Sequence, residues 1–282
     1  MIYLNGSWMP SHEARISVLD RGFLFGDGVY ELIPVYARKA FRLEEHLRRL
    51  RHSLDGIRLP NPHSDSQWTQ LIQELVAAHP FGNQSVYLQI TRGAAPRDHA
   101  FPKGTPPTVL LMSNPLNDPP PELIENGVSA ITGPDIRWGR CDLKTINLLP
   151  NVLATQAAAE QACVETVMFR DGVLTEGAAS NIFVVKDGVV LAPAKDHRVL
   201  PGITYDVVLE LAAENGISSK VGDIAISEVR LADELWLTSS SREVQAIVNL
   251  DSKPVGSGRP GPVYRRIYAL YQAFKRELTG SR

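Results

Sequence analysis

The chain has 282 residues, of which 44% are hydrophobic and 21% charged, and its formal net charge is −2. This length allows two domains, or one large one, with an ample core. The near-neutral charge and the lack of a basic run argue against a nucleic-acid surface, and no apolar run reaches membrane-spanning length.

The two cysteines, Cys141 and Cys163, form no disulfide framework and show no metal-ligand spacing, which fits a reducing compartment. The N-terminal "MIYLNGSWMP" lacks the charged start and apolar stretch of a secretion signal. We therefore expect a cytoplasmic protein with small-molecule substrates and with no metal, membrane or nucleic-acid partner.

Residues 1–113 are expected to form a small domain of mixed α and β elements. "YLNGSW" predicts a hairpin around Asn-Gly, and "GVYELIPVY" and "AFRL" predict a strand pair that turns at Arg38 and Lys39. Leucines at helical spacing predict a helix over 43–55. A second helix, over 67–78, follows the capping residues Ser64, Asp65 and Ser66, and "QSVYLQITRG" and "PTVLLMS" indicate buried strands.

Residues 114–121 are the first half of the most proline-dense stretch, and we expect them to be an interdomain linker. The remainder, 122–282, is expected to form a larger domain. It begins with the strand "VSAITG", and two Asp-Gly turns punctuate its later strands. Helices are predicted over 151–162, 203–215 and 264–278, and "ELWLTSSS" is a strand that runs into a hydroxyl-rich loop.

Lys144 differs from the other lysines because "CDLKTINLL" surrounds it with leucine and isoleucine. A lysine in apolar surroundings can serve as an amine nucleophile. The alternative is an amphipathic lysine at a helix start, whose amine reaches the solvent.

Glu176 precedes a run of small residues in "LTEGAASNIFVV", where a ligand could approach the backbone, although a turn alone also explains the run. Several groups could bind an anion. Pro-Gly precedes a helix at Ile203 and Thr204, which predicts free N–H groups at a positive helix end. Three serines follow a strand at 239–241, and His46 and Arg49 share a helix face.

The segment 95–102, "APRDHAFP", holds Arg97 and His99 two positions apart. The prolines disfavour helix, and in an extended segment both side chains point to one face. They could bind an anion there, although a solvated loop also explains them. The lysine, the carboxylate and the several phosphate donors together form the inventory that pyridoxal phosphate requires. No P-loop and no complete G-x-G-x-x-G is present.

At this point the sequence resembles the fold-type IV pyridoxal-phosphate enzymes, which include D-amino acid transaminases, branched-chain aminotransferases and aminodeoxychorismate lyases. The motifs that match in order are "DRGFLFGDGVYE", "EEHLRRL", "LKTINLLPNVLA", "EGAASNIF", "LPGIT" and "LTSSSREV". The resemblance implies a mixed α/β two-domain fold with the cofactor between the domains, and a homodimer.

The resemblance also implies roles for individual residues. Lys144 would carry pyridoxal 5'-phosphate as a Schiff base, and Glu176 would pair with the pyridine nitrogen. Leu200 would pack near the ring, and the phosphate would be held by Arg49, Ile203, Thr204, Ser239 and Ser240.

The substrate α-carboxylate would be gripped by Tyr30, Arg97 and His99, the last two on a loop that reaches in from the neighbouring subunit. This pair favours transamination of D-amino acids such as D-alanine with a 2-oxo acid acceptor. The alternatives are a branched-chain L-amino acid or (R)-amine transaminase, aminodeoxychorismate lyase, or a pyridoxal-phosphate-binding protein without turnover. Arg242 and Tyr205 depart from the family pattern near the expected phosphate or pocket wall, which bears on substrate breadth.

Overall fold

A computed structural model describes residues 1–280 and divides into two compact units. The first unit comprises Met1–Asn117 together with Leu143–Leu148, and the second comprises Asp118–Asp142 and the chain from Leu149 onward. Two features of the structure do not follow the expected boundaries. Strand β6 (Thr108–Pro115) extends into the expected linker, and residues 143–148 pack with the first unit because their backbone pairs with a strand there. As an assignment of domains, the division 1–113, 114–121 and 122–282 stays a prediction.

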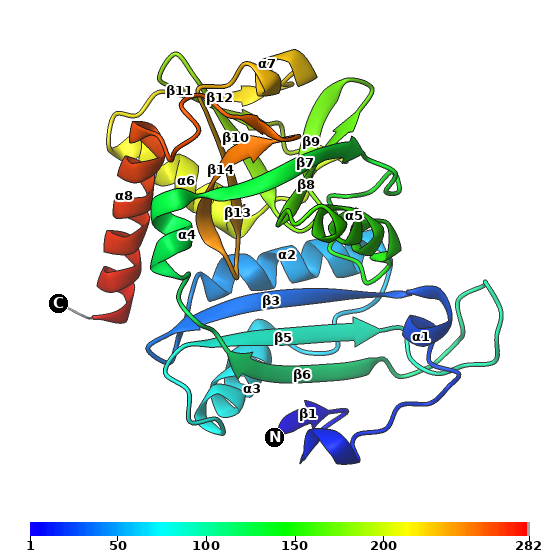
Figure 1. Ribbon diagram of the computed structural model, residues 1–282. Helices are drawn as coiled ribbons and strands as arrows, with labels where there is room; N and C mark the ends of the chain where they lie inside the picture. Colours follow the sequence, from blue (N-terminus) through cyan, green and yellow to red (C-terminus); the bar gives the residue numbers. More distant parts are fainter. Residues whose placement is uncertain (281–282) are drawn as a thin grey trace. The chain divides into compact units, whose positions relative to one another are not determined.

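The first unit is built on a six-stranded antiparallel sheet in the order β2-β1-β6-β5-β3-β4 (Figure 1). Its other strands are β1 (Ile2–Leu4), β2 (Ser7–Met9), β3 (Gly28–Tyr36), β4 (Lys39–Ala40) and β5 (Gln84–Thr91). Its helices are α1 (Arg21–Phe25), α2 (Leu43–Gly56) and α3 (Asp65–Ala77), with a 3-10 turn at Ser11–Glu13.

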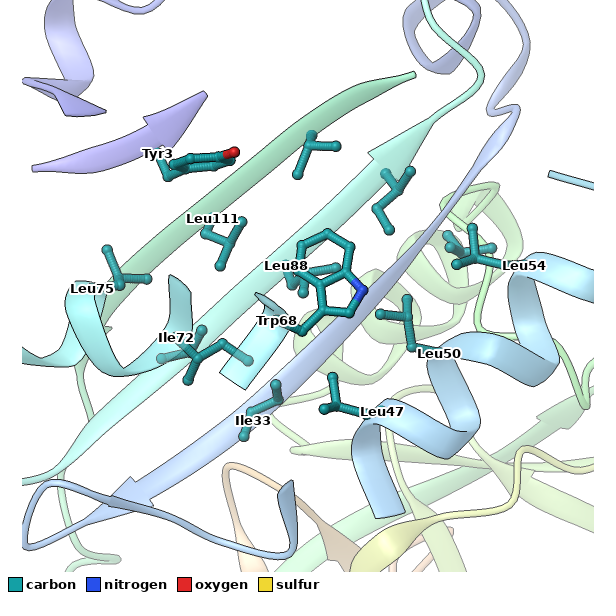
Figure 2. Packing of buried hydrophobic residues seen from close by; sticks show 14 of the residues in the cluster. Tyr3, Ile33, Leu47, Leu50, Leu54, Trp68, Ile72, Leu75, Leu88 and Leu111 are labelled. Carbon is teal, nitrogen blue, oxygen red and sulfur yellow. The ribbon is translucent and has the colours of Figure 1, made fainter. Parts of the chain in front are cut away.

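Helices α2 and α3 bury their apolar faces against this sheet. Figure 2 shows Leu47, Leu50 and Leu54 of α2 beside Ile33 of β3 and Trp68 of α3. The leucine spacing therefore predicted both the helix and its buried face. A capping box between Ser64 and Gln67 starts α3, as the cluster of capping residues indicated.

The second unit is built on a nine-stranded mixed sheet in the order β12-β11-β10-β13-β14-β7-β8-β9, with β15 paired to β14. The strands are β7 (Val128–Pro134), β8 (Glu165–Arg170), β9 (Val173–Gly177), β10 (Asn181–Lys186), β11 (Val189–Pro193), β12 (Ser219–Gly222), β13 (Glu234–Ser239), β14 (Glu243–Leu250) and β15 (Lys253–Pro254). The helices are α4 (Pro121–Asn126), α5 (Leu149–Glu160), α6 (Ile203–Glu214), α7 (Ile226–Arg230) and α8 (Pro262–Thr279).

The predicted turns are confirmed at Asn5-Gly6, Asp171-Gly172 and Asp187-Gly188. Both residues of each pair have positive φ, the conformation of a two-residue hairpin turn. The expected turn at Arg38 and Lys39 lies one residue earlier, at Ala37-Arg38, and β4 ends at Ala40. Within residues 1–280 no helix is long and apolar enough to cross a membrane.

Candidate active site

Lys144 lies on the segment of the first unit that pairs with the edge of β3. The Lys144 N–H donates to Ser53 Oγ at 3.0 Å, and the Lys144 carbonyl accepts from the Tyr30 N–H at 2.9 Å. Its half-buried side chain places Nζ 4.2 Å from the centroid of the Tyr30 ring. The two backbone hydrogen bonds fix where the side chain starts, so the structure brings together the predicted nucleophile and the predicted substrate-facing tyrosine.

Arg49 of α2 is held by a buried carboxylate that the sequence reasoning missed. Glu31 Oε1 and Oε2 accept from Arg49 Nε and Nη2, each at 2.8 Å, and His46 Nδ1 lies 2.8 Å from Glu31 Oε2. Burial alone would raise the pKa of Glu31, but Arg49 and His46 lower it to about 2. Burial lowers the pKa of His46. Glu31 therefore stays ionised at neutral pH and orients the guanidinium that is predicted to meet the phosphate.

Arg97 and His99 lie in an exposed loop between β5 and β6 that bends at 96–97 and 99–100, so the segment is not extended as the sequence argument assumed. The two side chains nevertheless gather at one place. The Arg97 guanidinium lies 5.3 Å from the Phe25 ring centroid, and the His99 ring lies 5.4 Å from it. Within residues 1–280 neither makes a hydrogen bond or ion pair with Tyr30 or Lys144.

Glu176 is the last residue but one of β9 in the second unit and is 5% exposed. One carboxylate oxygen pairs with the Arg137 guanidinium. The other accepts from Asn181 Nδ2 at 3.0 Å and from the Leu200 N–H at 3.2 Å. Burial raises the pKa of Glu176 to about 7, although the Arg137 charge acts in the opposite direction. This carboxyl can therefore take up or release a proton near neutral pH.

Arg137 is itself oriented by Asp135, which accepts from its Nε at 2.9 Å and from its Nη2 at 2.8 Å. Burial alone would raise the pKa of Asp135, but Arg137 lowers it to about 2. Sequence reasoning missed Asp135, Arg137 and Asn181. The only signal was Asn181 inside the quoted motif "EGAASNIF".

The predicted phosphate donors of the second unit occupy two places. Ile203 and Thr204 form the first turn of α6 behind Gly202, where backbone N–H groups have no intrahelical acceptor. Ser239 ends β13, and its Oγ accepts from the Arg242 N–H at 3.1 Å, which leaves the hydroxyl proton to donate. Ser240 follows it, half-buried. The neighbouring Thr238 Oγ1 is buried and has no hydrogen-bond partner among residues 1–280.

Arg242 and Tyr205 depart from the family pattern, and both were expected near the phosphate or the pocket wall. Tyr205 is 1% exposed, its ring centroid lies 5.0 Å from that of Phe183, and its hydroxyl donates to the Pro193 carbonyl at 2.8 Å, so it belongs to the core and not to a pocket wall. Arg242 donates to the Val164 carbonyl at 3.2 Å and lies 3.5 Å from Glu165 Oε2.

Comparison with known proteins shows the family to which the chain belongs. The family model "Amino-transferase class IV" matches residues 28–250, so the chain belongs to the class IV aminotransferases and is an aminotransferase, as the motifs predicted. A D-alanine aminotransferase of Bacillus licheniformis is 38% identical over 271 residues, which cover 96% of this chain and 95% of that protein.

Two solved structures place the fold. The T.th. branched-chain amino acid aminotransferase with pyridoxamine 5'-phosphate matches with a TM-score of 0.91 and 27% identity, over 100% of this chain and 94% of that one. A fold IV-transaminase from Curtobacterium pusillum matches with a TM-score of 0.82 and 26% identity, over 93% and 92% of the two chains. These matches confirm the expected fold class, a two-domain, mixed α/β fold of type IV.

Proposed function

We propose that this aminotransferase transfers the amino group of a D-amino acid such as D-alanine to a 2-oxo acid, using pyridoxal 5'-phosphate. The observation that carries the proposal is the gathering of Arg97 and His99 on Phe25, in a chain that is 38% identical to a D-alanine aminotransferase. A guanidinium and an imidazole side by side suit a carboxylate, because the planar fork of arginine binds it bidentately.

Each unit holds groups that suit pyridoxal phosphate. The first offers the amine of Lys144. The second offers a buried carboxylate, a helix start, serine hydroxyls and Thr238 Oγ1, which is buried and has no hydrogen-bond partner among residues 1–280. When bound, this cofactor supplies an electron sink for the carbanion that forms when a substrate Cα proton leaves. The residues that would hold it are Lys144, Glu176, Arg49, Leu200, Ile203, Thr204, Ser239 and Ser240.

Lys144 Nζ would be the covalent anchor and then the base that removes the Cα proton of the substrate and delivers a proton to the carbon of the cofactor's former aldehyde group. Its backbone pairing with β3 keeps the amine beside Tyr30. Glu176 would accept an N–H from the ligand through its ionised carboxylate. Because its pKa is about 7, a cationic N–H donor favours the ionised form near neutral pH.

Tyr30, Arg97 and His99 would bind the substrate carboxylate, and we propose that they do so in a homodimer. Exposed apolar side chains support self-association. In the first unit they surround α1 and the Arg97 loop: Val18 is 74% exposed, Phe23 70%, Ile16 55% and Phe101 49%. A cytoplasmic location is retained as part of the proposal, supported by two unpaired cysteines.

A branched-chain L-amino acid aminotransferase is the second candidate, favoured by the structural match with a TM-score of 0.91. The experiment is a half-reaction without acceptor. The purified protein loaded with pyridoxal phosphate receives D-alanine, L-leucine or (R)-1-phenylethylamine, and its absorption spectrum is followed. The proposal is supported if D-alanine alone rapidly converts the bound cofactor to its aminated form and gives stoichiometric pyruvate. Conversion with L-leucine or with the amine instead refutes the substrate assignment, and no conversion with any donor contradicts aminotransfer altogether.

A further inference from the structure

The motif "DRGFLFGDGVYE" builds a short framework around α1. Asp20 caps the helix, since its Oδ1 accepts from the Gly22 N–H at 2.8 Å. Its Oδ2 accepts from Thr91 Oγ1 at 3.0 Å and from Thr108 Oγ1 at 2.6 Å, so the cap is tied to both strands that flank the Arg97 loop. A Cβ on Gly22 would lie 2.3 Å from Thr91, so only glycine permits this close approach.

Arg21, the next residue, connects this framework to the loop. Its side chain is 4% exposed. Its Nη1 donates to the Asp98 carbonyl at 2.5 Å and to the Ala100 carbonyl at 3.3 Å, and its Nη2 donates to the His99 carbonyl at 3.3 Å. One guanidinium thus binds three successive carbonyls in the stretch that presents Arg97 and His99.

Asp27 fixes the direction of that guanidinium. Its Oδ2 accepts from Arg21 Nε and from Arg92 Nε, each at 2.8 Å. Burial alone would raise the pKa of Asp27, but the two arginines lower it. Arg92 extends the framework, because its guanidinium donates to the Ile57 carbonyl at 2.7 Å and lies 3.7 Å from the Phe101 ring centroid. Residues 98–101 of the loop are therefore contacted by two buried arginines that share one carboxylate.

Phe25, at the end of α1, completes the framework. Its ring centroid lies 4.9 Å from the Arg21 guanidinium, 5.3 Å from that of Arg97 and 5.4 Å from the His99 ring. Arginine on an aromatic face is attracted electrostatically. Arg21 thus binds the backbone of the loop, and Phe25 contacts the side chains of Arg97 and His99 (Figure 1 shows α1 beside this loop).

We propose that Arg21, oriented by Asp27 and supported by Phe25, is the positioning residue that sets where Arg97 and His99 meet the carboxylate of the substrate. This inference rests on the proposed function, since it assigns the loop to carboxylate binding. A guanidinium that is displaced from its place loses the bidentate hydrogen bonds by which it binds a carboxylate. Arg21 therefore acts on amino acid affinity while the amine chemistry at Lys144 proceeds as before.

The test compares Arg21→Lys with wild type and with a matched control, Arg38→Lys. Lysine keeps the charge but cannot bind three carbonyls and Asp27 at once. Arg38 is the control because its guanidinium also binds a row of carbonyls in the same unit, those of Val76, Ala77, His79 and Phe81. We expect Arg21→Lys to raise KM for D-alanine about tenfold, with kcat and cofactor occupancy within twofold, and Arg38→Lys to leave KM unchanged.

Hydrogen exchange gives a readout independent of activity. The Ala100 N–H donates to Asp98 Oδ1 at 3.1 Å, so its amide should exchange faster in Arg21→Lys only, and amides of 76–82 should exchange faster in Arg38→Lys only. If Arg21→Lys does not fold, Phe25→Leu serves instead and should raise KM about threefold. A KM within twofold of wild type, or unchanged exchange at the Ala100 amide, overturns the inference. A wild type that does not transaminate D-alanine refutes the proposed function separately.

Discussion

Replacing Glu31 with glutamine should remove the charge that holds Arg49 and His46 in place. Glu31 and His46 are fully buried and Arg49 is 7% exposed. Removing one partner of a buried ion pair costs about 3–5 kcal/mol, because the remaining charge stays buried without compensation. Glu31→Gln should therefore lower the free energy of unfolding by about 3 kcal/mol or more at pH 7.

The pKa of Glu31 makes this loss depend on pH in a defined direction. The pKa of the Glu31 carboxyl falls from 4.5 to about 2 on folding, which contributes about 3 kcal/mol to the free energy of unfolding. This contribution is fully present above pH 4.5 and is lost as the pH falls toward 2. Glutamine does not titrate. The difference between wild type and Glu31→Gln should therefore shrink by about 3 kcal/mol between pH 6 and pH 2.5, while other acids titrate equally in both proteins.

Urea unfolding across this range, followed by tryptophan fluorescence, measures the difference; Trp68 reports on the first unit because it is fully buried there. Glu45→Gln is the control. Glu45 pairs with Arg42 at 3.0 Å on the same helix but is 30% exposed, so its loss should cost less than about 1 kcal/mol. A cost of Glu31→Gln below 1 kcal/mol, or one that does not change with pH, would refute the reasoning about the buried triad.

Three further predictions concern the proposed chemistry. Lys144→Ala should lose the absorption band of the covalently bound cofactor and all transamination, and a variant that still turns over would end the assignment of Lys144. Arg97→Gln should raise KM for D-alanine about 10- to 100-fold, because a hydrogen bond to a charged group contributes about 1.5–3 kcal/mol; a KM within twofold of wild type would remove Arg97 from the substrate site. Arg137→Gln should raise the pKa of Glu176 above about 7, since burial is then unopposed by the nearby charge; infrared titration of the carboxyl band against Glu176→Gln measures this, and an unchanged or lower pKa would contradict it.

Local signals predicted much of the fold. The paired positive φ values at Asn5-Gly6 and at the two Asp-Gly turns follow from residues that tolerate that conformation. The leucine spacing of α2 follows from the single face that it buries. These features depend on neighbours within a few positions along the chain, so the sequence carries them directly.

Strand β14 was not predicted because its pattern is altered by buried polar residues. Glu243 and Gln245 are 2% and 7% exposed. Glu243 is neutralised by Lys275, whose Nζ lies 2.7 Å from its Oε1, and hydrogen-bonded by Gln272, both on α8. Gln272 and Lys275 offset the cost of burying this glutamate in a central strand. Because they lie some 30 residues away along the chain, no local pattern reveals them.

Distance along the chain also limits what the sequence predicts of the candidate site. The motifs predict roles for Lys144, Glu176 and Arg49 but do not indicate the groups that orient Glu176 and Arg49, since Arg137 lies 39 positions from Glu176 and Glu31 lies 18 positions from Arg49. Yet Arg21 and Glu31 belong to the quoted motif "DRGFLFGDGVYE", and both are buried. A charge is buried only where partners compensate it. Charged residues in such a motif are therefore positions where a distant partner must be sought. Glu31 binds Arg49, 18 positions away, and Arg21 binds the carbonyls of 98–100, 77 to 79 positions away. Arg49 is predicted to bind the cofactor, and the stretch that Arg21 binds carries the residues proposed to bind the substrate.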